Sequence, residues 1–277
     1  MKRFLCIFLL LIPLLVCRGQ DCVTTPEDRA LAEKLIAALK SYPEEDSGEL
    51  TLRAARALIG QPYVAGTLEE QPQETLCVYL TRTDCILFVE TCLGLARTAR
   101  LGGGFETFSE EIRQSRYRDG RCRRYEDRLH YTTEWARQAE RRGVLKDVTK
   151  TLGGIDLNHP VHFMSEHADA YPRMTDPEAI AYIEDAINAR PSAYIPKDLL
   201  QKALGGILSG DIILFTSATE GLDVAHCGIA LAEPGQPVRF IHASTGPMQV
   251  VLESRTLEEY VTGRKALSGI QVYRPVF

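Results

Sequence analysis

The sequence predicts an α+β fold in which a helix that begins with a cysteine packs on an antiparallel sheet. Two observations carry this prediction. Apolar residues recur at helical spacing in the first part of the chain, whereas short β-branched segments separated by turn residues fill the last part. Helices are expected at 26–39, at 50–58 and from Cys85 onward. Strands are expected at 210–215, 223–231, 238–244, 248–252 and 269–274.

Three further helices are expected before the first strand, each opened by residues that favour a helix start. They are Ser109 to Tyr117, Thr132 or Thr133 to Arg141, and Asp176-Pro177 to about Ala189. The run Gly102–Gly104 is expected to end the helix that begins at Cys85. No repeat or interdomain linker is evident, so residues 20–277 are expected to form one domain.

Residues 1–19 are expected to be a secretory signal peptide. Lys2 and Arg3 give a short positive region, and residues 4–16 are almost wholly apolar, although too few to span a membrane. Cys17 follows Val16, where a small residue is expected before a lipidated cysteine, so lipid anchoring is the less favoured alternative. We therefore expect a periplasmic or secreted protein with no membrane span.

Charge argues against a nucleic-acid partner. The formal net charge is −5, which gives no global attraction to nucleic acid. Seven arginines lie between Arg113 and Arg128, and they form either a solvated face or a patch that binds carboxylates. The mature chain is long enough to bury a core without disulfides or metals, and we expect a monomer without a cofactor.

Cys85 is the candidate nucleophile. Thr83 or Asp84 can cap the helix that follows, which places Cys85 at the positive end of the helix dipole, where a thiolate is favoured. The alternative is that Cys85 is a small buried apolar residue. A base close to the thiol would decide between the two interpretations.

His226 and His242 supply a candidate base and a residue to orient it. His226 lies at the start of one predicted strand and His242 in the next, and consecutive strands joined by a short turn usually pair. Together with Cys85 they fit the nucleophile, base and orienter of acyl transfer. Two alternatives remain, hydrogen-bonded strand histidines and a zinc site that includes Cys227, although no short metal-binding pair is present. His130 is the rival base.

Several segments in order resemble the N-acetylmuramoyl-L-alanine amidase-like family, which is related to the NlpC-type cell-wall cysteine peptidases. They are 60–69 (GQPYVAGTLE), Asp84-Cys85, Arg128-Leu129-His130-Tyr131 with Trp135, the Gly-Asp-Ile-Ile strand, 225–230 (AHCGIA) and His242-Ala243-Ser244. The resemblance implies a papain-like fold and a Cys-His-His triad at Cys85, His226 and His242. It also implies that Tyr63 lines the substrate cleft.

Other side chains are candidate substrate contacts. Trp135 and Tyr131 can form a wall for a sugar or peptide, and Arg128 can pair with a carboxylate, or these residues simply pack a helix entry. Asp84 or Glu90 can hold a free amine. The expected function is an exported peptidoglycan hydrolase that cuts the N-acetylmuramoyl-L-alanine amide. The alternatives are a γ-D-glutamyl-diamino acid endopeptidase and a non-catalytic wall-binding protein.

Six cysteines remain after residue 19. Cys85 and Cys92 are two helical turns apart, about 10 Å, which is beyond disulfide reach. A bridge between Cys77 and Cys122 is the one pairing that we expect.

Overall fold

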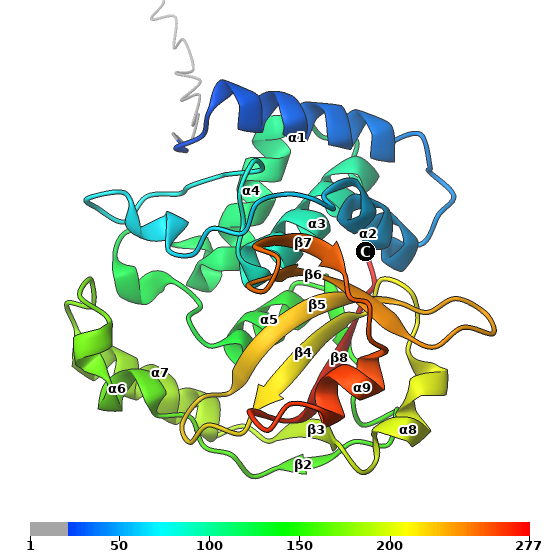
Figure 1. The fold of residues 1–277 in the computed structure, drawn as a ribbon. Helices are drawn as coiled ribbons and strands as arrows, with labels where there is room; N and C mark the ends of the chain where they lie inside the picture. The colour runs from blue at the N-terminus through cyan, green and yellow to red at the C-terminus, as the bar shows by residue number, and fades with distance from the viewer. Residues whose placement is uncertain (1–21) are drawn as a thin grey trace, which may run out of the picture.

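A computed structural model describes residues 22–277, so the predicted signal peptide lies outside the described residues. Figure 1 shows the early helices α1 to α4 gathered together and the strands β4, β5 and β8 side by side. Within residues 22–277, no helix is both long and apolar enough to cross a membrane.

The first three helices confirm the sequence prediction. Helix α1 (Pro26–Leu39) opens with a capping box at Thr25, and α2 (Ser47–Ala57) begins earlier than predicted because Asp46 caps it. Helix α3 (Cys85–Arg100) starts at the candidate nucleophile and ends before Gly102, whose φ of +70° favours glycine.

The next helices follow the prediction less closely. Helix α4 spans Phe105–Arg116, so the predicted cap at Ser109 is wrong, because Ser109 is buried inside the helix and Gly104 precedes it. Helix α5 (Thr132–Arg141) has the expected extent, but the distant Asp223 carboxylate accepts its Thr133 N–H at 2.7 Å. Helix α7 (Pro177–Asn188) is capped by Asp176 as predicted. The remaining helices are α6 (Phe163–Glu166), α8 (Leu200–Ala203) and α9 (Leu257–Thr262).

Within the described residues, eight strands form one antiparallel sheet in the order β2-β3-β8-β4-β5-β6-β7, with β1 also pairing with β8. The predicted strands are present as β4 (Ile212–Ser217), β5 (Val224–Leu231), β6 (Arg239–Ser244), β7 (Gln249–Leu252) and β8 (Leu267–Pro275). Three shorter strands were not predicted: β1 (Leu145–Asp147), β2 (Ile155–Leu157) and β3 (Ser192–Pro196).

The sheet is buried on both faces. Ile212 and Leu214 of β4 belong to the core shared with α1 to α5, whereas Ile213 and Phe215 belong to the core under α8 and α9. This alternation is the period of two expected for a strand. The α+β class with α3 packed on an antiparallel sheet is therefore present.

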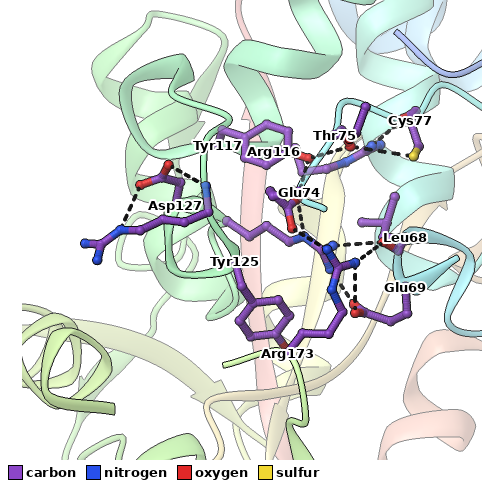
Figure 2. A network of polar contacts seen from close by, with 12 residues as sticks. Leu68, Glu69, Glu74, Thr75, Cys77, Arg116, Tyr117, Tyr125, Asp127 and Arg173 are labelled. Carbon is purple, nitrogen blue, oxygen red and sulfur yellow. Dashed lines mark hydrogen bonds and ion pairs between the residues drawn. The ribbon is translucent and has the colours of Figure 1, made fainter. Parts of the chain in front are cut away.

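The arginine-rich segment is not an open basic patch. Five of its arginines contact carboxylates: Arg113 with Glu110, Arg116 with Glu90, Arg118 with Glu134, Arg124 with Asp176 and Arg128 with Glu74. Figure 2 shows Glu69 and Glu74 next to Arg173, which forms ion pairs with both carboxylates. The segment therefore fixes loops to one another.

The expected disulfide is absent. All six cysteines between residues 22 and 277 are free thiols, so the predicted Cys77–Cys122 bridge is wrong. The Cys77 thiol instead donates to the Thr75 carbonyl oxygen at 3.5 Å, and both residues are visible in Figure 2.

Candidate active site

Cys85 is the first residue of α3, and Asp84 caps the helix through a 2.9 Å hydrogen bond from the Leu87 N–H. The helix lies against β5 and β6. The buried Cys227 thiol of β5 donates to the Cys85 carbonyl oxygen at 3.1 Å, which ties the start of the helix to the strand. The cysteine is thus held between a helix terminus and the sheet.

His226 and His242 lie in contact. His226 Nε2 is 2.6 Å from His242 Nδ1, and the two rings meet edge to face. Gly228, two residues beyond His226 on the same face of β5, leaves room for this pair. A Cβ atom at Gly228 would lie 3.3 Å from His242 Cβ and 2.9 Å from the Phe240 ring.

Glu253 extends this pair, and the sequence prediction missed it. Its Oε2 is 3.5 Å from His242 Nε2, and Arg255 donates to its carboxylate at 2.9 and 3.1 Å. A signal was available in the sequence. The hairpin register that pairs Ser244 with Gln249 and His242 with Val251 puts Glu253 on the same face as His242.

The protonation states fit a directional chain. Burial, together with the charge of His226, lowers the pKa of His242 to about 3, so its ring is neutral near pH 7. Burial opposes ionisation of Glu253, but the hydrogen bonds from Arg255 outweigh it and lower its pKa to about 2. A neutral His242 can donate from Nε2 to this carboxylate and accept at Nδ1 from His226.

The Cys85 thiol is set up as a thiolate. Contact with the Cys227 thiol and with the neighbouring His226 lowers the pKa of the Cys85 thiol well below the usual value, against the effect of burial. The same contact, with complete burial, raises the pKa of Cys227. Cys85, which also lies at the helix N-terminus, is therefore the thiol of this pair whose ionisation is favoured.

Main-chain hydrogen bonds position Tyr63 near Cys85. Its N–H donates to the Met248 carbonyl oxygen at 2.9 Å, and the next residue, Val64, donates to the Thr83 carbonyl oxygen at 2.8 Å. Burial, and to a smaller extent the charge of Cys85, raise the pKa of the Tyr63 phenol.

A cleft of about 950 Å³ contains these side chains. Its lining includes Tyr63, Cys85, His226, His242 and Glu253, and further along Ser244, Arg255, Tyr260, Arg264 and Lys265. The structure thus brings four of the predicted site residues into one cavity.

Asp84 and Arg128 line a separate cavity of about 200 Å³, together with Glu90 and His130. Burial raises the pKa of Asp84 to about 6. Arg128 is occupied by Glu69, Glu74 and the Leu68 carbonyl oxygen. His130 faces the Tyr125 carbonyl oxygen at 2.9 Å, and burial lowers its pKa to about 4.

Tyr131 and Trp135 are not brought to either cavity. The Tyr131 hydroxyl donates to Glu184 at 2.7 Å, and the Trp135 indole N–H donates to Ser115 at 3.0 Å. Both rings are buried, with Trp135 only 1% exposed. Their predicted wall is in fact helix packing, because the apolar area of these rings is better buried than left at a cleft.

Over residues 22–277, no three His, Cys, Asp or Glu side chains gather as a metal site. Cys85, Cys227, His226 and His242 are the residues that the sequence offered for a zinc site. The same residues are engaged in the thiol and imidazole contacts described above.

Comparison with known proteins identifies the family to which the chain is similar. The model of the N-acetylmuramoyl-L-alanine amidase-like family matches residues 53–270. An N-acetylmuramoyl-L-alanine amidase from Bacteroides uniformis is 31% identical, over 83% of this chain and 99% of its own, with a TM-score of 0.78. A protein from Bacteroides fragilis, provisionally described as a xylanase, is 35% identical over 80% and 99%, with a TM-score of 0.76.

A protein from Legionella pneumophila shares the fold at 21% identity, over 91% of this chain and 95% of its own, with a TM-score of 0.68. None of the curated proteins matches. The family model covers most of the chain, including the segments that hold Cys85, His226 and His242. This chain belongs to the N-acetylmuramoyl-L-alanine amidase-like family.

Proposed function

We propose that this protein is an exported, papain-like cysteine amidase that hydrolyses the bond between N-acetylmuramic acid and L-alanine in peptidoglycan. The observation that carries the proposal is the cleft in which Cys85 lies beside the hydrogen-bonded His226–His242 pair. Family membership supports the substrate class, and the apolar N-terminal segment supports export to a periplasm or beyond.

The first step forms a thioester. The Cys85 thiolate attacks the lactyl carbonyl carbon, and the Cys85 backbone N–H at the helix terminus stabilises the oxyanion. The imidazolium of His226 gives its proton to the leaving nitrogen, the carbon–nitrogen bond breaks, and a peptide that begins with L-alanine departs. The acyl group stays on sulfur.

The second step hydrolyses the thioester and regenerates the free enzyme. His226 removes a proton from water, the resulting hydroxide attacks the thioester, and the carbon–sulfur bond breaks to release the muramic acid and the Cys85 thiolate. His242 accepts a hydrogen bond from His226, and its Nε2 lies 3.5 Å from the Glu253 carboxylate, so it holds the His226 ring in the tautomer that faces the thiol. Glu253 is a positioning residue.

Glycoside hydrolysis, the activity in the description of the Bacteroides fragilis relative, has less support. That reaction ordinarily needs two carboxyl groups on either side of the bond, one of them protonated. Among the described residues, Glu253 is the one carboxylate that lines the cleft, and Arg255 keeps it ionised.

A defined disaccharide muropeptide with mass analysis of the products tests the proposal. Release of a peptide that begins with L-alanine is the expected result, and Cys85→Ala should release none. A sugar-linked L-alanyl-D-glutamate stub would favour the endopeptidase alternative. An unchanged muropeptide that binds the protein would favour the non-catalytic wall-binding alternative.

A further inference from the structure

The cleft beside Cys85 has an excess of positive charge. Three cations line it, Arg255, Arg264 and Lys265, against the single carboxylate of Glu253. Arg255 is neutralised by Glu253 through their two side-chain hydrogen bonds. Elsewhere in the described chain, no carboxylate lies within ion-pair distance of Arg264 or Lys265. These two cations are therefore available to a ligand.

Arg264 is held close to the reacting groups. Its guanidinium carbon lies 4.1 Å from the centre of the Tyr260 ring, and that ring is 5.7 Å from the His242 ring and 6.4 Å from the His226 ring. The Lys197 ammonium donates to the Arg264 carbonyl oxygen at 2.6 Å, which fixes the main chain between α9 and β8. Ordering before binding lowers the entropic cost of recognising an anion.

The two halves of the proposed substrate differ in charge. An N-acetylated sugar is neutral, whereas the stem peptide carries a free α-carboxylate on the D-glutamate that follows L-alanine. An arginine fork matches the planar geometry of a carboxylate, and an adjacent ammonium adds a second charge-assisted hydrogen bond. The neutral sugar offers these cations no such partner.

We propose that Arg264 and Lys265 form a subsite for the α-carboxylate of the D-glutamate residue, so that the leaving peptide lies along the connection between α9 and β8. The inference rests on the proposed function and specifies its substrate further. It makes the protein selective for stem peptides with a free carboxylate over those in which this group is an amide.

Two muropeptides that differ only in this group, D-glutamate or its α-amide, test the inference. Wild type should cleave the free acid with about tenfold higher kcat/KM, mainly through KM. The double variant Arg264→Gln with Lys265→Gln should cleave both at the efficiency that wild type has for the amide. The matched control Arg123→Gln removes an exposed cation outside the cleft and should keep the tenfold preference.

Two results would overturn the inference: equal cleavage of acid and amide by wild type, or a tenfold preference that survives in the double variant. Raising the salt concentration should shrink the wild-type preference and leave the double variant unaffected, because salt screens exposed charges. Binding of both muropeptides to Cys85→Ala, measured by calorimetry, distinguishes a failure of the proposed function from a failure of the subsite inference. Absence of both cleavage and binding would overturn the proposed function and this inference together, whereas cleavage without preference overturns the inference alone.

Discussion

His242 should make the protein lose stability in acid, and the size of this loss tests the hydrogen-bond chain of the site. The ring is 1% exposed, and its pKa falls from 6.5 to about 3 on folding. Between these values the unfolded chain binds a proton that the folded chain does not, so the stability present above pH 6.5 is lost as the pH falls. From pH 7 to pH 4.5 this single group should lower the free energy of unfolding by roughly 2–3 kcal/mol.

Urea unfolding of wild type and His242→Gln at pH 7 and pH 4.5 measures the effect. The glutamine does not titrate, so the difference between the two pH values should be smaller by roughly 2–3 kcal/mol in the variant. His167→Gln, at an exposed ring outside the cleft, is the matched control and should behave as wild type. An identical pH dependence for wild type and His242→Gln would show that His242 is not held neutral, and the chain from His226 to Glu253 would then be wrong.

Four further predictions concern the chemistry. Cys85 should react fastest with iodoacetamide at neutral pH, and Cys85→Ala should abolish hydrolysis without changing the thermal midpoint; an active variant would contradict the mechanism. His226→Ala should reduce kcat nearly as much as loss of the thiol. His242→Asn should retain measurable turnover because its amide oxygen can still accept the His226 N–H. Equal losses of kcat in the two variants would argue against separate roles for the two histidines. Glu253→Gln should lower kcat/KM by about tenfold, or 1.4 kcal/mol, because His242 loses the carboxylate that faces its Nε2. Arg255→Gln should give a smaller effect, and an unchanged kcat/KM in Glu253→Gln would exclude a positioning role for this carboxylate. A chelator should leave the rate unchanged, whereas activity lost to chelation and regained with zinc would assign the thiol and imidazoles to a metal site.

Local sequence patterns predicted those parts of the site that depend only on residues close together in the sequence. The Asp84 cap before an apolar stripe correctly predicted a helix starting at Cys85, and alternation correctly predicted the strands that hold His226 and His242. The periodicity of apolar residues and the capping of a helix depend on a few adjacent residues, so both can be predicted without knowledge of the rest of the fold.

Burial of a side chain by segments distant in sequence could not be predicted from local patterns. Trp135 and Tyr131 have the residue types of a substrate wall, but the fold buries both rings and gives each polar tip an internal partner. Arg128 likewise matches a carboxylate-binding residue, and its carboxylates turn out to be Glu69 and Glu74 of the same chain. Residue type alone does not distinguish a ligand from an internal partner that is distant in sequence.

The segment 60–64 explains how the parts of the chain that carry Cys85 and His242 are held together. It pairs along the outer edge of β7 through main-chain hydrogen bonds of 2.8–2.9 Å and then pairs with Thr83, directly before the α3 cap. The hairpin that carries His242 is thereby joined to the helix that carries Cys85 by backbone contacts, which have no rotamer freedom to lose. Catalysis is sensitive to displacements of about 1 Å, so a backbone connection is a suitable restraint. The segment also covers a sheet edge that would otherwise expose unpaired groups. Because the backbone fixes the position of Tyr63, a substitution of its side chain reports on contacts of the ring within the cleft and not on the placement of Cys85.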